Sequence, residues 1–131
     1  MPNKKTIKLF VAATGQHVGK TTTCLGMLTG LRKYLPDSRV NYMKPVGQQH
    51  VIVDGVKVDK DVALFKNWFH LTAREPAMSP VVVSSGYTRD YIDGKKNRND
   101  LVTLIDNAVE EVSKESDLIV VEGTGHTGVG E

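Results

Sequence analysis

The sequence is poor in cysteine, has no long apolar run and shows no strong excess of charge. Cys24 is the only cysteine among 131 residues, which excludes an internal disulfide and agrees with a reducing compartment. No apolar run approaches the roughly 20 residues that a membrane-spanning helix needs. The 17 basic and 15 acidic residues give a net charge of +2, too balanced to indicate nucleic-acid or membrane binding through bulk charge.

The beginning of the chain lacks the features of a secretion signal. Residues 1–5 are basic, but the apolar stretch after them contains Lys8 and leads into a glycine-rich loop. A signal peptide has a longer apolar core and a small-residue cleavage site. We therefore expect a cytoplasmic protein. Its length, with 40% hydrophobic and 24% charged residues, is typical of one globular domain.

Apolar runs alternate with helical patterns along the chain. Strands are expected over residues 7–14, 40–46, 79–84 and 117–122, helices over 19–35, 60–70 and 98–116, and loops over 48–58 and 86–99. The first strand is almost wholly apolar, which predicts burial on both faces of a parallel sheet. The alternation predicts an α/β fold, with a parallel sheet flanked by helices.

The segment between the first strand and the first helix is close to a phosphate-binding P-loop. The usual pattern is G-x-x-x-x-G-K-[ST]; here a threonine stands at the first glycine position, and the last three positions match. The strand–loop–helix context is the one that the motif requires. The residues predicted to bind the nucleotide are Thr14, Gly15, Gln16, His17, Val18, Gly19, Lys20, Thr21 and Thr22.

Each matching position has a chemical reason. Backbone N–H groups of the loop and of the helix N-terminus attract anionic oxygens, and Gly19 lets the backbone approach them closely. Lys20 is expected to place a cation between the β- and γ-phosphates, and the hydroxyl of Thr21 is a ligand for Mg²⁺. We therefore predict binding of a nucleoside triphosphate, ATP together with Mg²⁺.

Acidic side chains near the predicted crevice are candidates to hold the metal. Glu122 ends an apolar strand, and the carboxyl ends of parallel strands face the ligand crevice. Asp59 and Asp61 open the second helix, where acidic residues commonly serve as caps or dipole partners. The sequence leaves Asp61 open between a cap and a metal ligand. Lys44, at the end of the second strand, is equally open between an anion-binding group and a solvent-exposed lysine.

The chain ends directly after a glycine-rich loop that follows the last strand. A doubly wound fold continues with further strands and helices. We expect residues 1–131 to be a P-loop nucleotide-binding domain that is a truncated N-terminal part of a larger doubly wound domain.

Four sequence blocks, in order, resemble one P-loop family: TGQHVGKT at 14–21, KPV at 44–46, DKDVAL at 59–64 and VVEGTG at 120–125. The family comprises dethiobiotin synthetase, cobyrinic acid a,c-diamide synthase and the N-terminal region of phosphotransacetylase. The resemblance implies that Lys20 and Lys44 are the catalytic residues. Lys20 would contact the phosphates, and Lys44 would approach a carbamate or its phosphorylated form. It also implies that Thr21, Asp61 and Glu122 hold Mg²⁺.

The resemblance implies an ATP-dependent carbon–nitrogen ligase that phosphorylates a carboxyl-type oxygen. Gly15 departs from dethiobiotin synthetases, which usually have an acidic residue there, so the acceptor substrate stays open. The alternative is a non-catalytic nucleotide-sensing domain, as in the phosphotransacetylase region, which shares the lysine-proline block. Relatives dimerise near their sites, so we expect a homodimer and possibly a downstream domain on the same chain. The expected partners are a nucleotide and a small molecule, without nucleic acid or membrane.

Overall fold

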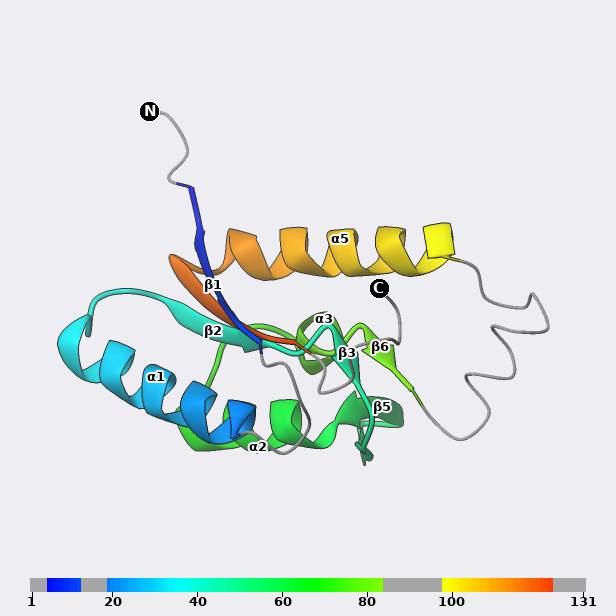
Figure 1. Cartoon of the computed structure of the whole chain (residues 1–131), viewed down its shortest axis with the longest axis horizontal. Helices are drawn as coiled ribbons and strands as arrows, with labels where there is room; N and C mark the ends of the chain where they lie inside the picture. Colours follow the sequence, from blue (N-terminus) through cyan, green and yellow to red (C-terminus); the bar gives the residue numbers. More distant parts are fainter. Residues whose placement is uncertain (1–4, 13–18, 84–97, 124–131) are drawn as a thin grey trace.

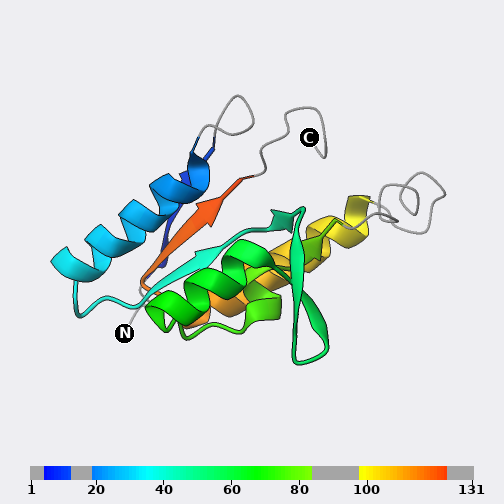
Figure 2. The same cartoon turned by 90° about the horizontal axis from the view of Figure 1, so that it is seen from below.

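The fold has three layers. The computed structural model describes residues 5–12, 19–83 and 98–123. Helix α5 (Arg98–Lys114) covers one face of a central sheet, and helices α1 (Lys20–Tyr34) and α2 (Lys60–Phe69) cover the other (Figure 1). Seen from below, α1 lies alongside β1 (Ile7–Val11) and β7 (Leu118–Glu122), whereas α2 lies alongside β2 (Val40–Met43) (Figure 2). The predicted α/β class is confirmed.

The central sheet is parallel and has the order β1-β7-β2. Strand β7 is the middle strand and is buried throughout, as its run of Leu, Ile and Val predicts. In the register, Val11 lies opposite Glu122, and Met43 lies opposite Val121. The carboxyl ends of all three strands therefore meet at one edge of the sheet.

The expected burial of strand β1 is not observed. It was predicted to be buried on both faces, yet Ile7 is 57% and Phe10 is 73% exposed. The reason is its position, because within the described sheet β7 is the one strand that pairs with β1. The strand also ends at Val11, and residues 14–18 of the predicted phosphate loop lie outside the described residues.

The predicted strand over residues 40–46 is interrupted. Strand β2 ends at Met43, and β3 (Val46–Gly47) pairs with β6 (Val81–Val82) in a separate two-stranded sheet. Pro45 explains the break, because it has no N–H for the sheet ladder. The predicted strand over residues 79–84 shortens to β6. The chain therefore turns at Lys44, whose backbone N–H donates to the Met78 carbonyl at 2.9 Å.

The prediction of a loop over residues 48–58 is wrong. Strands β4 (His50–Val53) and β5 (Val56–Asp59) form an antiparallel hairpin. The turn residues Asp54 and Gly55 have φ angles of 50° and 81°. An Asp-Gly pair between β-branched residues favours this kind of tight turn, so the signal was present in the sequence. The short helix α3 (Glu75–Met78) was also not expected.

The three long helices agree with their predicted ranges to within two residues. Gly19 precedes α1 with a φ of 82°, a conformation that glycine adopts without strain. The side chain of Asp59 caps α2 by accepting hydrogen bonds from the N–H groups of Asp61 and Val62. In residues 5–12, 19–83 and 98–123, no helix is long and apolar enough to cross a membrane. The predicted loop over 86–99 lies outside the described residues up to 97, and α5 takes up its last two positions.

Candidate functional site

Four side chains that are distant in sequence meet at the carboxyl edge of the sheet. They come from the first turn of α1, the end of β2, the first turn of α2 and the end of β7, and they are Thr21, Lys44, Asp61 and Glu122. The hydroxyl of Thr21 lies 3.1 Å from Oε2 of Glu122 and 3.4 Å from Oδ2 of Asp61. The structure thus brings together the three predicted metal ligands and one of the two predicted catalytic lysines.

Lys44 is held inside this cluster. Its ammonium nitrogen lies 2.9 Å from Oδ2 of Asp61, 3.5 Å from Oδ2 of Asp59 and 3.8 Å from Oε2 of Glu122. The sequence left open whether Lys44 is an anion-binding group or a solvent-exposed lysine. Its side chain is only 16% exposed, which excludes the solvent-exposed lysine. Burial disfavours its charge, but the hydrogen bond that it donates to Asp61 and the charges of its three acidic neighbours outweigh burial, so the pKa of Lys44 is raised.

Glu122 is buried and both of its carboxylate oxygens have partners. Oε1 accepts a hydrogen bond of 2.7 Å from the phenol of Tyr42, and Oε2 accepts one from Thr21. The exposed fraction of Glu122 is 2%. A solvated strand-end glutamate is therefore excluded. A buried carboxyl group at a strand end, facing a helix N-terminus, is typical of a site that handles cations or phosphates.

Asp59 combines a structural role with a place in the site. Its Oδ1 caps α2, whereas Oδ2 is buried without a hydrogen-bond partner and faces the Lys44 ammonium. Burial raises the pKa of the Asp59 carboxyl, and the charge of Lys44 offsets only part of this. Gly47 packs directly on this carboxylate, because a Cβ there would overlap Oδ2. The predicted cap is confirmed, but its contact with Lys44 was not predicted.

Cys24 lies beneath the cluster on α1. It is fully buried, as expected for a small core residue. Burial, followed by the charge of Glu122 and a hydrogen bond to it, raises the pKa of the Cys24 thiol to about 12. The thiol is therefore protonated at neutral pH and is not a nucleophile.

The predicted phosphate-binding residues are described only in part. Gly19 immediately precedes α1, and Lys20, Thr21 and Thr22 are its first three residues, of which Lys20 is half-buried. Thr14 to Val18 lie outside the described residues. The positive φ of Gly19 turns the chain into the helix, which directs the free N–H groups of the first turn towards this edge.

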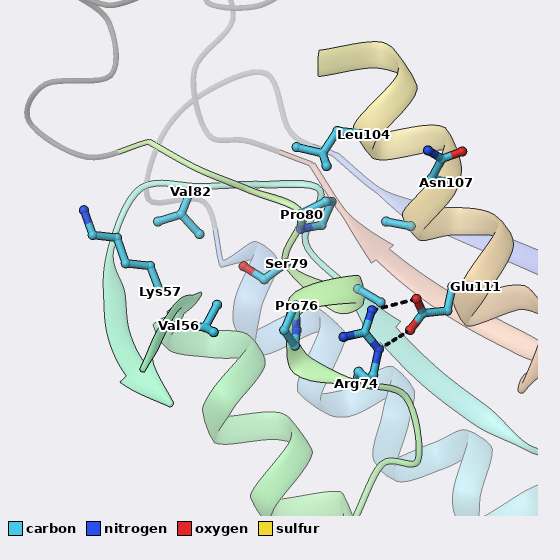
Figure 3. A pocket seen from close by; sticks show the side chains of 12 residues that line it. Val56, Lys57, Arg74, Pro76, Ser79, Pro80, Val82, Leu104, Asn107 and Glu111 are labelled. Atoms are coloured by element: carbon cyan, nitrogen blue, oxygen red, sulfur yellow. Dashed lines mark hydrogen bonds and ion pairs between the residues drawn. The ribbon is translucent and has the colours of Figure 1, made fainter. Parts of the chain in front are cut away.

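A cavity of about 390 Å³ lies elsewhere, between the β4–β5 hairpin, α3 and α5 (Figure 3). None of the four cluster residues lines it. Its wall contains an Arg74–Glu111 pair with two hydrogen bonds of 2.7 and 2.8 Å, and Lys57 also lines it (Figure 3). Among the described residues, Glu111 is the one acidic residue in this lining and is paired with Arg74, so the cavity lacks the acidic cluster of the strand-end site.

The sheet topology, the Gly-Lys-Thr start of α1 and the buried acidic strand end define a P-loop nucleotide-binding domain. The comparisons agree. The family model AAA_26, described as AAA domain, matches residues 7–131. The chain therefore belongs to this family of P-loop NTPases, which includes dethiobiotin synthetase-like members. None of the curated proteins compared with the chain matches it.

Sequence reasoning missed Tyr42 and Gly47 as parts of the site. A signal for Tyr42 existed, because it precedes Lys44 by two residues, and residues two apart on an extended strand share a face. Gly47 offered a weaker signal, since a glycine inside a strand often marks close approach of another chain segment. Neither signal identifies the partner, which depends on the sheet order.

Proposed function

We propose that this chain is the MgATP-binding domain of an ATP-dependent ligase that resembles dethiobiotin synthetase or cobyrinic acid a,c-diamide synthase. The reaction phosphorylates a carboxyl or carbamate oxygen. The observation that carries the proposal is the position of the Lys44 ammonium, which is held 2.9 Å from Oδ2 of Asp61 and 3.8 Å from Oε2 of Glu122. A cation there neutralises an oxygen that attacks the γ-phosphorus.

The beginning of α1 supports binding of the phosphates. Its first four N–H groups have no partner within the helix, and the helix dipole adds a partial positive charge at the same end. Lys20 adds a full charge as the first helical residue. We assign Lys20 to the β- and γ-phosphates, where an ammonium group balances the charge that develops during transfer.

The oxygen atoms of Thr21, Asp61 and Glu122 fit a Mg²⁺ ion. Neighbouring ligands of an octahedral Mg²⁺ lie about 3 Å apart, because each bond is about 2.1 Å. The Thr21 hydroxyl is 3.1 and 3.4 Å from the nearest oxygens of Glu122 and Asp61. In the described part of the chain, no three His, Cys, Asp or Glu side chains form a metal-binding group. A Mg²⁺ site commonly takes one or two carboxylates and completes its shell with waters and phosphate oxygens, so Thr21, Asp61 and Glu122 would be enough protein ligands.

Lys44 is assigned to the acceptor. The γ-phosphoryl group passes from ATP to a carboxyl or carbamate oxygen of the acceptor, and ADP leaves. A nitrogen of the acceptor then attacks the activated carbon, and inorganic phosphate leaves as the C–N bond forms. When bound, Mg²⁺ would neutralise phosphate charge, while Lys44 orients the attacking oxygen.

The test measures ADP release from MgATP by the full-length protein, with and without diaminopelargonic acid and bicarbonate. The proposal expects release that depends on both additions and is lost in Lys44→Met but kept in Lys57→Met, an exposed lysine on β5. Tight ATP binding without turnover supports the alternative, a nucleotide-sensing domain. Turnover with another carboxylate acceptor keeps the ligase class and replaces the substrate.

A further inference from the structure

The two carboxylate oxygens of Glu122 have different surroundings. Oε1 accepts a hydrogen bond of 2.7 Å from the Tyr42 phenol. Oε2 lies 3.1 Å from the Thr21 hydroxyl and 3.8 Å from the Lys44 ammonium. Only Oε2 therefore faces the other oxygens of the cluster, and Oε1 is turned into the protein.

The fold fixes this arrangement. Tyr42 on β2 lies opposite Val120 on β7, so it shares a face of the sheet with Glu122, two residues further along. The phenol ring is fully buried and packs edge-on against Phe65 of α2, with ring centroids 4.6 Å apart and an interplanar angle of 77°. This contact favours one ring position. The phenol oxygen is thereby kept beside Oε1.

We propose that Tyr42 is a positioning residue that restricts Glu122 to one metal-binding oxygen and so favours Mg²⁺ over Ca²⁺. The inference rests on the proposed MgATP site. Mg²⁺ requires compact octahedral geometry, whereas Ca²⁺ takes more oxygens and often binds a carboxylate through both of them. With Oε1 occupied by the phenol, Glu122 supplies the single ligand that suits the smaller ion.

The Tyr42 phenol is the donor in its hydrogen bond with Glu122. An ordinary phenol carries its proton at neutral pH and can therefore donate to Oε1 of Glu122. The neighbouring thiol of Cys24 also hydrogen-bonds Glu122, but a thiol is the weaker donor and does not replace the phenol.

The experiment is calorimetric measurement of ATP affinity in saturating Mg²⁺ and in saturating Ca²⁺. The quantity of interest is the ratio of the two dissociation constants, which does not depend on turnover. Tyr42→Phe keeps the ring and removes only the donor. We expect it to shift the ratio towards Ca²⁺ by about tenfold, the size of one hydrogen bond to a charged group. A loss of stability alone lowers both affinities and leaves their ratio unchanged.

Three further variants sharpen the result. Tyr34→Phe makes the same chemical change at an exposed tyrosine and is expected to leave the ratio at the wild-type value. Phe65→Leu loosens the Tyr42 ring and is expected to shift the ratio in the same direction, by less. Phe69→Leu removes another ring that packs on Phe65 but has no ring contact with Tyr42 among the described residues, and it serves as the packing control.

The outcomes separate the two proposals. An unchanged ratio in a folded Tyr42→Phe protein overturns the role of Tyr42 and leaves the MgATP site standing. If Tyr42→Phe does not fold, as judged by circular dichroism, an unchanged ratio in Phe65→Leu overturns it instead. Wild-type protein that binds neither MgATP nor CaATP overturns the proposed function and this inference together.

Discussion

The ammonium nitrogen of Lys44 lies 2.9 Å from Oδ2 of Asp61, and this contact joins the turn after β2 to the first turn of α2. Asp59 and Glu122 face the same ammonium at 3.5 and 3.8 Å. One basic group therefore separates three acidic groups in a partly buried space. The positive charge of Lys44 reduces the electrostatic repulsion between these three carboxylates.

Replacing Lys44 by methionine is expected to destabilise the fold. Removing one partner of a buried ion pair costs several kcal/mol, and the partial exposure here reduces the expected loss to about 2 kcal/mol. Mg²⁺ should recover part of that loss, because a cation again separates the carboxylates. Urea unfolding with and without Mg²⁺ measures both effects. Equal stabilisation of wild type and Lys44→Met by Mg²⁺ would contradict this explanation, and Lys57→Met is the matched control.

Replacing Lys20 by alanine is expected to remove most of the MgATP affinity. A charge-assisted contact to phosphate is worth about 1.5–3 kcal/mol, which corresponds to a loss of roughly 10- to 150-fold in affinity. Titration calorimetry measures the affinity directly. Lys33→Ala removes an exposed lysine near the other end of α1 and should bind MgATP normally. Equal affinities for the two variants would place the phosphates elsewhere.

Alanine at Gly47 and alanine at Gly30 are expected to act in opposite directions. A Cβ at Gly47 would overlap Oδ2 of Asp59, which must then move away from Lys44 and release the cap of α2. Losing a cap alone costs about 1 kcal/mol. Gly30 lies inside α1 with open space around it, so alanine there should stabilise by about 0.5–1 kcal/mol. Thermal unfolding of both variants shows whether the free energy of unfolding falls in Gly47→Ala and rises in Gly30→Ala.

Asn41 is a buried polar residue that joins three segments. Its amide donates to the side chains of Thr72 and Ser116 and accepts from the Ala73 N–H. Asn41→Leu is expected to cost about 2–3 kcal/mol, because it leaves buried donors and acceptors unpaired. Chemical denaturation measures the loss. The matched control, Asn107→Leu at an exposed position of α5, should stay close to wild type.

Cys24 is expected to resist alkylation in the folded protein. Its thiol is buried and its pKa is raised to about 12, so at pH 8 the reactive thiolate is scarce. Iodoacetamide labelling followed by mass spectrometry should track unfolding in urea. Rapid labelling of the folded protein at pH 8 would show that the thiol is ionised or accessible.

The raised pKa of the Cys24 thiol makes the free energy of unfolding depend on pH in the alkaline range. The folded state holds the Cys24 proton more tightly than the unfolded state, whose thiol has its ordinary pKa near 9. Its contribution is therefore complete below that value and is lost as the pH rises towards about 12. Above pH 9 the free energy of unfolding should fall, and it should fall less steeply in Cys24→Ala.

Much of the fold could be predicted because its signals are local. The three long helices have periodic apolar faces, and the last strand is a continuous apolar run from Leu118 to Val121, so their positions agree with the structure. The hairpin over residues 50–59 was missed although Asp54 and Gly55 mark its turn. Strand β1 was predicted to be buried on both faces because its residues are apolar, yet burial depends on how many neighbours a strand has, which its own sequence does not specify.

The sequence predicted which residues belong to the site, but it did not predict which of them contact one another. Thr21, Asp61 and Glu122 were grouped through motifs and a family resemblance, and the structure brings them together. The sequence left Lys44 undecided, because an isolated lysine at a strand end carries no information about what surrounds it. Tyr42 was missed because its partnership with Glu122 depends on β2 pairing with β7 in one particular register.

The strand order also has a consequence for the order of folding. Strands β1 and β2 do not pair with each other, and both pair with β7, which is more than 70 residues further along the chain. During synthesis the first two strands must therefore wait for residues 118–122 to leave the ribosome before any of this sheet can close. Until then, the unpaired backbone edges and the apolar side chains of these two strands are exposed, so chaperones can bind them and they can aggregate.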